Sequence, residues 1–353
     1  MPKPPPKPSS RSWFPTLLRA AVVLSLALSI GLSLALRFDR QPHEWIELLR
    51  YVPYLAWLLP ASAVFLASWW LGWGWRLAAA LAPALIATAV MAPAWGQPDS
   101  GSGALRLMTY NIKSYLADEH VGGFDLLGLE IAQHDADVIV MQDADEFTQA
   151  DSVMPAPLVA AFRGRQIVKQ GEFMIASRLP LRGCRTPQMP GKHETPHRYL
   201  RCTVTVDGRA VDIVTTHFLS PRSGLNATRH DRLGGLEEWH INLAARLRQS
   251  QSLARDLAQQ PNPLVVAGDL NAPEASPVVR HLLDTGLRDA FSSAGSGYGF
   301  THGHSLRPYL SFLRIDHILV SPDIGVREVF TGGSAGSAHR PVIADLLVQR
   351  QPR

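Results

Sequence analysis

Five short polar motifs follow apolar, strand-like stretches in the C-terminal two-thirds of the chain. Three are centred on Asn111, on Asp143 and on His217, the fourth is Gly-Asp-Leu-Asn at residues 268–271, and the fifth combines residues 314–319 with residues 337–342. Their carboxylates and imidazoles can take up and release protons, and their amides can orient a polar group. Because proteins commonly place functional side chains in loops at strand ends, the motifs predict a site assembled from several segments.

Each motif alone has an ordinary structural explanation. Asn111 could cap the end of a strand, residues 269–271 could form an Asx turn, and His217 could be a core or surface histidine. Residues 316–317 could be a polar pair in a surface turn. These explanations do not account for all five motifs in one order, so we interpret the set as one site.

The ordered set resembles the endonuclease/exonuclease/phosphatase superfamily, which includes DNase I-like nucleases, inositol polyphosphate phosphatases and bacterial sphingomyelinases. The resemblance covers about residues 104–349, and three apolar stretches ahead of it are similar to those of a membrane-anchored bacterial branch. It implies an α/β (α+β layered) fold, a four-layer sandwich in which two β-sheets pack face to face with helices outside. It also implies a metal-dependent hydrolase that acts on phosphoester bonds.

The resemblance implies a role for each catalytic motif residue. Asp269 matches the residue that activates water, and Asn271 matches the one that orients the phosphate or the nucleophile. His339 matches the histidine that stabilises the phosphoryl oxygens, Asp316 its carboxylate partner, and His217 a second phosphate-contacting histidine. We expect the carboxylate to orient the imidazole of His339 and to favour its charged form.

The metal-binding part departs from the family pattern. Asn111 and Asp143 match the family's metal-binding amide and carboxylate, and such hard oxygen ligands suit Mg²⁺ or Mn²⁺. The family usually has Glu where Asp143 stands, which makes Glu146 an alternative ligand, and a metal-binding Asp where Ala338 stands. We therefore expect weakened metal binding. A rearranged metal site, a deliberately inactivated variant and a weakly active or non-catalytic descendant are all consistent with this, and we favour the first because the catalytic motif residues are present.

The elements that must position these motifs are alternating strands and helices. Short apolar runs predict strands at residues 105–111, 138–141, 173–177, 198–206, 210–216, 264–267, 315–320 and 341–348. Helical spacing predicts helices at residues 124–134, 236–259 and 276–284. Mixed elements of this kind indicate a layered α/β or α+β domain.

The N-terminal third has a different character. Residues 1–16 are Pro-rich and basic, which predicts a disordered tail, and residues 96–103 predict a flexible linker. Three apolar stretches, at about 17–36, 52–75 and 77–95, predict transmembrane helices in the bacterial inner (cytoplasmic) membrane. A buried helical core, or a cleaved signal peptide at 17–36, would be alternatives. With three spans and a cytoplasmic N-terminus, or with a cleaved signal and two spans, the large domain lies on the outer, periplasmic side.

Charge and cysteine content limit the partners. Residues 1–103 contain 8 Lys/Arg and 4 Asp/Glu, and the remaining residues contain 26 of each kind. The large domain therefore has no net positive charge and makes no strong case for nucleic acid. Cys184 and Cys202 lie in neighbouring strand-like stretches and could form a disulfide, which would fit an oxidising compartment, or remain two thiols.

The substrate is expected to be a phosphorylated small molecule or lipid, because the domain is tethered to a bilayer. Arg222, Arg229 and Arg232, in a long polar segment at 219–239, could bind a phosphate, or this segment could be a solvated surface loop. Four further histidines have no motif partner and no zinc-binding spacing, namely His193, His197, His302 and His304. A membrane-anchored phosphate-binding module with a degenerate site, and a nuclease, are the alternative functions.

Overall fold

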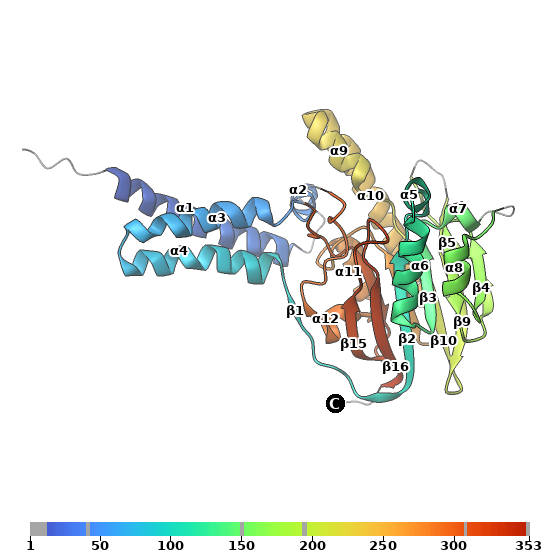
Figure 1. The fold of residues 1–353 in the computed structure, drawn as a ribbon. Helices are drawn as coiled ribbons and strands as arrows, with labels where there is room; N and C mark the ends of the chain where they lie inside the picture. Colours follow the sequence, from blue (N-terminus) through green and yellow to red (C-terminus); the bar gives the residue numbers. More distant parts are fainter. Residues whose placement is uncertain (1–12, 40–42, 149–151, 193–195, 307–308, 351–353) are drawn as a thin grey trace, which may run out of the picture. The chain divides into compact units, whose positions relative to one another are not determined.

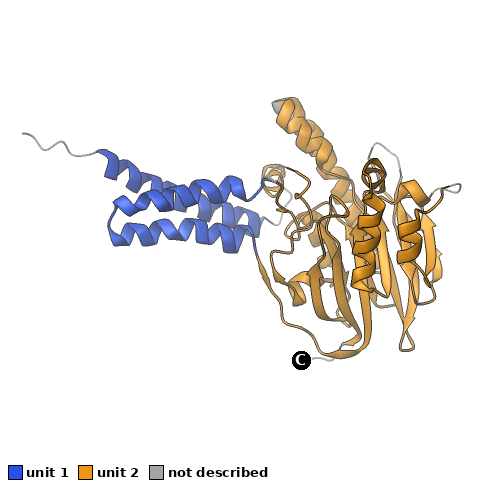
Figure 2. Ribbon diagram, in the orientation of Figure 1, with its two compact units in different colours: residues 1–39, 52–92 blue, residues 40–51, 93–353 orange. Residues whose placement is uncertain are grey.

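The computed structural model describes residues 13–39, 43–148, 152–192, 196–306 and 309–350. The chain divides into two compact units, which Figure 2 distinguishes by colour. Unit 1 comprises residues 1–39 and 52–92, and unit 2 comprises residues 40–51 and 93–353.

Unit 1 consists of three apolar helical segments. They are α1 (Trp13–Phe38), α3 (Leu55–Ala67) with the short helix η1 (Ser68–Trp70), and α4 (Trp73–Leu85) with the π-helical turn η2 (Ile86–Val90). Trp13–Phe38 and Trp73–Val90 are long and apolar enough to cross a membrane, whereas Leu55–Trp70 is shorter. The tail expected at 1–16 ends earlier than predicted, because α1 already includes residues 13–16; residues 1–12 lie outside the described chain.

Unit 2 contains two six-stranded sheets. The first has the order β15 (Gly325–Thr331), β16 (Val342–Arg350), β2 (Gly101–Asn111), β3 (Val138–Gln142), β5 (Phe173–Ser177), β4 (Gln166–Gln170). The second has the order β12 (Arg288–Asp289), β14 (Asp316–Val320), β11 (Leu264–Asp269), β10 (Arg209–His217), β9 (Leu200–Val206), β6 (Arg182–Arg185). Two small ribbons pair β1 (Ala94–Trp95) with β13 (Ser296–Gly297) and β7 (Gln188–Met189) with β8 (His197–Arg198).

Alternating side chains build the layers. Along β3, Val138 and Val140 pack into a core shared by the two sheets, while Ile139 and Met141 face the opposite way toward helices. This is the period-2 pattern of a strand that is covered on both faces. The outer face of the first sheet carries α6 (Gly123–His134), α7 (Asp145–Thr148) and α8 (Ala156–Ala161). Figure 1 shows α6 and α8 over this sheet.

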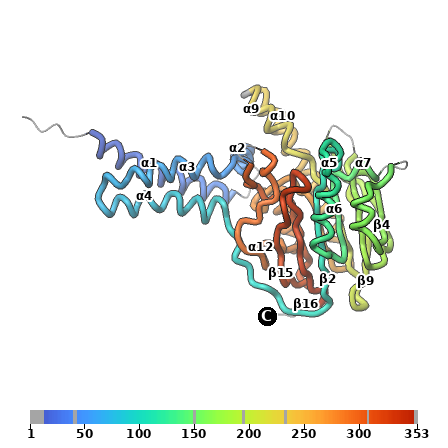
Figure 3. The backbone as a smooth tube through the Cα atoms, in the orientation of Figure 1, coloured from blue at the N-terminus to red at the C-terminus, as the bar shows by residue number. Residues whose placement is uncertain are grey.

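The outer face of the second sheet packs against α10 (Arg232–Leu257) and α11 (Pro277–Leu283), for example through Val266 and Leu319. Helix, sheet, sheet and helix therefore follow one another, and the predicted layered sandwich is confirmed. The tube in Figure 3 shows how β2, β15 and β16 share one sheet although they come from opposite ends of the large domain. The remaining helices are α2 (Glu44–Leu49), α5 (Ser114–Glu119), α9 (Arg222–His230) and α12 (Ala290–Ala294).

Two segments differ from the expectations. Residues 96–103 are not a free linker: Asp99 is buried and bonds Arg288 at 3.0 Å, and β2 already begins at Gly101, where pairing with β16 satisfies the backbone. The polar segment 219–239 is not a loop but is largely helical, because it contains α9 and the first turns of α10.

Cys184 and Cys202, on the antiparallel neighbours β6 and β9, form a disulfide.

Candidate active site

Strand pairing brings the polar motifs together. β2 and β3 are parallel neighbours, and so are β10 and β11, so each pair has two carboxyl ends at one edge of its sheet. Asn111 is the register partner of Gln142 in the first pair, and His217 is the partner of Asp269 in the second. β14 runs antiparallel to β11 and begins with Asp316 opposite Asp269. The motif residues of both sheets therefore meet at one end of the sandwich.

Asp269 lies at the centre of the site and is 1% exposed. Its Oδ2 accepts a hydrogen bond from Nδ2 of Asn111 at 2.9 Å, and its Oδ1 accepts one from the backbone N–H of Asn271 at 2.8 Å. Nε2 of His217 lies 3.5 Å from Oδ2, and Nε2 of His339 lies 3.8 Å from the same atom. The site thus holds a buried carboxylate between two imidazoles.

A first acidic group consists of Asp143, Glu172 and His217, whose ligand atoms lie within 4.8 Å of one another. Nδ1 of His217 lies 2.6 Å from Oε2 of Glu172 and 3.6 Å from Oδ1 of Asp143. Burial opposes the charged imidazole, but the carboxylates, Glu172 foremost, outweigh burial and raise the pKa of His217 to about 10. Nζ of Lys113 lies 2.5 Å from Oδ2 of Asp143, so this group contains two cations beside its two carboxylates.

A second acidic group consists of Asp269, Asp316 and His339. Nδ1 of His339 is hydrogen-bonded to Oδ2 of Asp316 at 2.9 Å, which confirms the predicted pair. The charged form expected for His339 is not supported: burial lowers the pKa of His339 to about 4 and raises that of Asp316 to about 6. The ring of His302 lies 4.6 Å from that of His339 between centroids, and burial and this neighbour lower the pKa of His302 to about 4.

The loop that follows β11 has a constrained backbone. A Cβ atom at Gly268 would lie 1.9 Å from the backbone oxygen of Thr216, so the close approach of β10 requires glycine. Asn271 has a left-handed backbone, with φ of 49°, and its Nδ2 donates to the backbone oxygen of Phe218 at 2.8 Å. Asn271 therefore anchors the loop at the same time as its N–H contacts Asp269.

The donor atoms of the site fit a hard divalent cation. Asp143 and Glu172 offer carboxylate oxygens close to each other, and Asn111 offers an amide oxygen at the end of the adjacent strand. Glu172 supplies a carboxylate that the sequence pattern did not include, whereas Ala338 supplies none. The residues present are therefore able to hold such an ion, with a donor set different from the one expected.

Several residues singled out by the sequence lie elsewhere. Glu146 is exposed on α7 and belongs to neither acidic group. Arg222 and Arg229 are exposed on α9, and within the described residues no ion pair links them to the acidic groups. Arg232 is the first residue of α10. The suggested phosphate-binding role of these arginines remains a prediction.

Two of the histidines that had no motif partner contact loops beside the site. Nε2 of His197 lies 2.5 Å from the backbone oxygen of His217, and Nε2 of His304 lies 2.9 Å from that of Ser337, so both support loops beside the site. His193 lies outside the described residues.

Sequence reasoning missed three residues of the site, namely Lys113, Glu172 and His302. Lys113 stands two positions after Asn111, which could have indicated it. Glu172 directly follows Gly171, whose φ of 57° marks a turn before β5, and a carboxylate at such a strand edge is a weak signal. For His302 no local signal exists.

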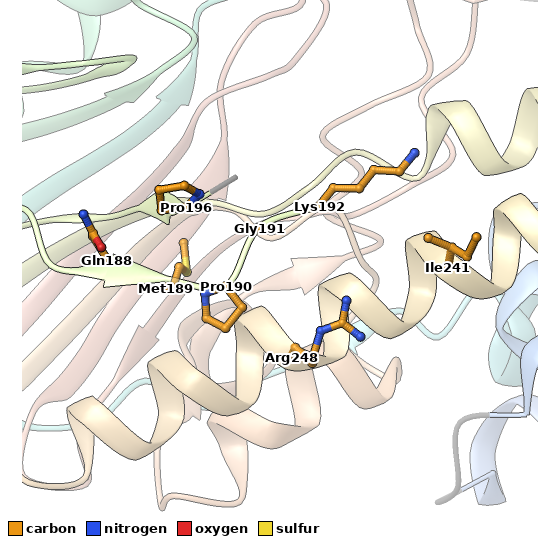
Figure 4. Close-up of a pocket in the computed structure, with 8 residues that line it drawn as sticks. All are labelled: Gln188, Met189, Pro190, Gly191, Lys192, Pro196, Ile241 and Arg248. Atoms are coloured by element: carbon orange, nitrogen blue, oxygen red, sulfur yellow. The ribbon is translucent and has the colours of Figure 1, made fainter. Parts of the chain in front are cut away.

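A cavity of about 640 Å³ lies apart from these residues, between α10 and the loop after β7 (Figure 4). Its lining residues are Gln188, Met189, Pro190, Gly191, Lys192, Pro196, Ile241 and Arg248. None of them belongs to either acidic group. The cavity is therefore distinct from the catalytic candidates.

The fold is a two-sheet sandwich flanked by helices, and one end of it holds a buried carboxylate–histidine site. Residues 108–339 match the model of the Endonuclease/Exonuclease/phosphatase family, and the chain belongs to this family. Members of the family are hydrolases that act on phosphoester bonds and generally use a divalent metal ion. No curated protein is significantly similar to the chain in sequence.

Solved structures share the fold at low sequence identity. An endonuclease/exonuclease/phosphatase from Bacteroides vulgatus is 19% identical with a TM-score of 0.54, and the match covers 69% of this chain and 98% of that one. A mannosyl-6-phosphatase from Bacteroides thetaiotaomicron is 17% identical (TM-score 0.51; 69% and 99% covered). The human Nocturnin catalytic domain with bound sulfate is 18% identical (TM-score 0.50; 72% and 96% covered). These likenesses establish the fold.

Proposed function

We propose that the chain is a membrane-anchored, metal-dependent phosphoesterase that hydrolyses a phosphodiester, phosphate ester or phosphoanhydride bond of a lipid-linked or envelope substrate. The observation that carries the proposal is the buried carboxylate of Asp269. It is oriented by Asn111 and by the N–H of Asn271, with His217 and His339 within 4 Å. This is the arrangement that a water-activating carboxylate and two phosphate-contacting imidazoles require.

The residues of the chain have complementary tasks in this reaction. Asp269 takes the proton of the attacking water. His217, whose pKa the neighbouring carboxylates raise to about 10 in the metal-free protein, donates to a phosphoryl oxygen. Burial lowers the pKa of His339 and favours its neutral form, and an anionic phosphate at its Nε2 would favour the charged form while Asp316 holds the ring in place. A divalent cation held by Asp143, Glu172 and Asn111 would polarise the phosphoryl group and neutralise developing charge.

Mg²⁺ or Mn²⁺ is the proposed ion, because the nearby donors are mainly carboxylate and amide oxygens. The convergence of Asp143 and Glu172 supports a rearranged metal site over a decayed one. The ion pair between Lys113 and Asp143 is the observation that favours the alternative function, a phosphate-binding module. If Lys113 permanently neutralises Asp143, an anion could bind without a metal and without hydrolysis.

Membrane anchoring on the outer side of the bacterial inner membrane has two kinds of support. Two helices of unit 1 are long and apolar enough to span a bilayer. The Cys184–Cys202 disulfide is of the kind that persists in oxidising compartments such as the periplasm. The balanced charge of residues 104–353 argues for a lipid-linked or small phosphorylated substrate over a nucleic acid.

The test uses the full chain in phospholipid nanodiscs with bis-p-nitrophenyl phosphate and p-nitrophenyl phosphate, in Mg²⁺, Mn²⁺ or EDTA. We expect hydrolysis that requires the metal and falls by about 10³-fold or more in Asp269→Asn. Asp284→Asn, the same change at an exposed residue, is the matched control and should retain activity. Activity that persists in EDTA and in Asp269→Asn would refute the mechanism. Metal-independent binding of phosphate without turnover would favour the binding module.

A further inference from the structure

The short helix α2 belongs to unit 2 although it lies in the sequence between α1 and α3 of unit 1. Three polar or aromatic side chains of residues 44–51 are buried, although an ordinary connecting loop would leave such side chains in solvent. Glu47 is 0% exposed, Arg50 is 8% exposed and Tyr51 is 6% exposed. A charged pair at this depth is costly unless its partners are fixed, so the burial indicates a specific docking of this segment onto the domain.

The docking point of this segment is the loop that carries the catalytic motif. The hydroxyl of Tyr51 donates to the backbone oxygen of Asn271 at 2.9 Å, and Nη1 of Arg246 on α10 donates to the Tyr51 hydroxyl at 2.6 Å. The same Nη1 lies 3.3 Å from the Asn271 oxygen. Asn271 is also the residue whose N–H bonds the carboxylate of Asp269, so these contacts hold the same residue that orients the reacting carboxylate.

A second contact holds the far end of the same loop. The hydroxyl of Ser276, which caps α11 by accepting from the N–H of Val278, donates to Oε1 of Glu47 at 2.6 Å. Oε2 of Glu47 lies 3.1 Å from Nε of Arg50. The loop from Asp269 to the start of α11 is therefore tied to residues 44–51 at both ends.

Aromatic packing fixes the segment laterally. The rings of Tyr51 and Trp239 meet edge to face with centroids 5.7 Å apart, and the indole N–H of Trp239 donates to the backbone oxygen of Glu44 at 3.0 Å. The guanidinium of Arg246 lies 5.4 Å from both ring centroids. Tyr51 and Trp239 also belong to one hydrophobic cluster with Ile315, the residue before Asp316.

We propose that residues 44–51, which connect the first two apolar helices, are a built-in part of the catalytic unit, and that Tyr51 is a positioning residue that holds the Asp269–Asn271 turn through the backbone oxygen of Asn271. This inference rests on the proposed phosphoesterase function for its catalytic consequence. A domain that begins at residue 104 lacks this support. The anchoring region would then supply the catalytic loop with part of its framework in addition to tethering it.

The test compares Tyr51→Phe with Tyr199→Phe in the full chain. Both changes delete one buried tyrosine hydroxyl and keep the ring, but the hydroxyl of Tyr199 bonds Asp256, outside the site residues. Hydrogen exchange is followed by mass spectrometry on the peptide that covers residues 268–276. We expect about 3- to 10-fold faster exchange of this peptide in Tyr51→Phe and no change in Tyr199→Phe.

Kinetics supply the catalytic readout on bis-p-nitrophenyl phosphate with Mn²⁺. In Tyr51→Phe we expect kcat to fall about 10- to 100-fold while KM stays within about threefold, because the loop is displaced and the binding groups remain. Unchanged exchange of the 268–276 peptide in a folded Tyr51→Phe protein overturns the positioning role, whatever the activity. If exchange accelerates but the wild-type protein hydrolyses neither chromogenic probe, the positioning stands and the phosphoesterase proposal fails.

Discussion

Replacing Glu172 with glutamine removes the carboxylate whose Oε2 lies 2.6 Å from Nδ1 of His217. Burial alone would lower the pKa of His217, and the charges of Glu172, Asp143 and Asp269 reverse this and raise it to about 10. Glutamine keeps nearly the same shape but carries no charge. An opposite charge at this distance typically shifts a pKa by about 1 to 3, so we expect the pKa of His217 to fall by that amount in Glu172→Gln.

The same change alters how stability depends on pH. The folded-state pKa of His217 lies above its ordinary value of 6.5, so its contribution to the free energy of unfolding is fully present below pH 6.5. That contribution is lost as the pH rises from 6.5 to about 10, by at most about 1.4 kcal/mol for each pH unit. In Glu172→Gln the pKa of His217 is lower, so this contribution should be smaller and should be lost at a lower pH. The variant should therefore start from a lower free energy of unfolding and lose less of it between pH 8 and pH 10 than the wild type.

The assay is an NMR titration of histidine imidazole nitrogens in the metal-free full chain, combined with thermal unfolding across the same pH range. Glu238→Gln is the matched control, since Glu238 pairs with Lys192 and does not contact His217. Adding Mg²⁺ to the wild type should also lower the pKa of His217, because a dication bound at Asp143 and Glu172 competes with the imidazolium. A wild-type midpoint near 6.5, or the same midpoint in Glu172→Gln, would refute the reasoning.

Two further predictions concern Ala338, which stands where the family usually has a metal-binding Asp, and the disulfide of the large domain. Ala338→Asp adds a carboxylate next to His339 and should leave Mn²⁺ binding within about threefold of the wild type in isothermal titration, because Asp143 and Glu172 already supply the carboxylates; an affinity about 10- to 100-fold tighter would show that the natural site is impaired. Cys184→Ser opens a disulfide that spans a sequence separation of 18 and should lower the free energy of unfolding by about 3 kcal/mol in urea titrations. Two free thiols in the non-reduced wild type, counted with a thiol reagent, would contradict this second prediction.

Much of the fold was predictable because it depends on local alternation. The strand expected at residues 173–177 is β5, and those expected at 138–141 and 264–267 are β3 and β11, each one or two residues longer. These runs alternate between two apolar environments, which is a property of the sequence itself. β4 and β15 were missed, because their polar residues, such as Lys169 and Arg327, interrupt the apolar pattern.

The candidate site was predictable to the extent that its residues belong to ordered motifs. Asp269, Asn111, His217, His339 and Asp316 are all in contact as a connected set. The charge state expected for His339 was wrong, because its burial outweighs the effect of the neighbouring carboxylate and only the structure reveals that burial.

The sequence by itself determined the family, the layered architecture and the identity of the motif residues, because each of these depends on residue type and order along the chain. Only the tertiary structure decided which further groups meet them. Glu172 joins Asp143 across the β3–β5 pairing, the ring of His302 lies against that of His339, and Tyr51 reaches Asn271 although 220 positions separate them. Contacts of this kind arise when sheets and helices pack in three dimensions, and a local pattern contains no information about which distant side chains will fill the space around a buried charge.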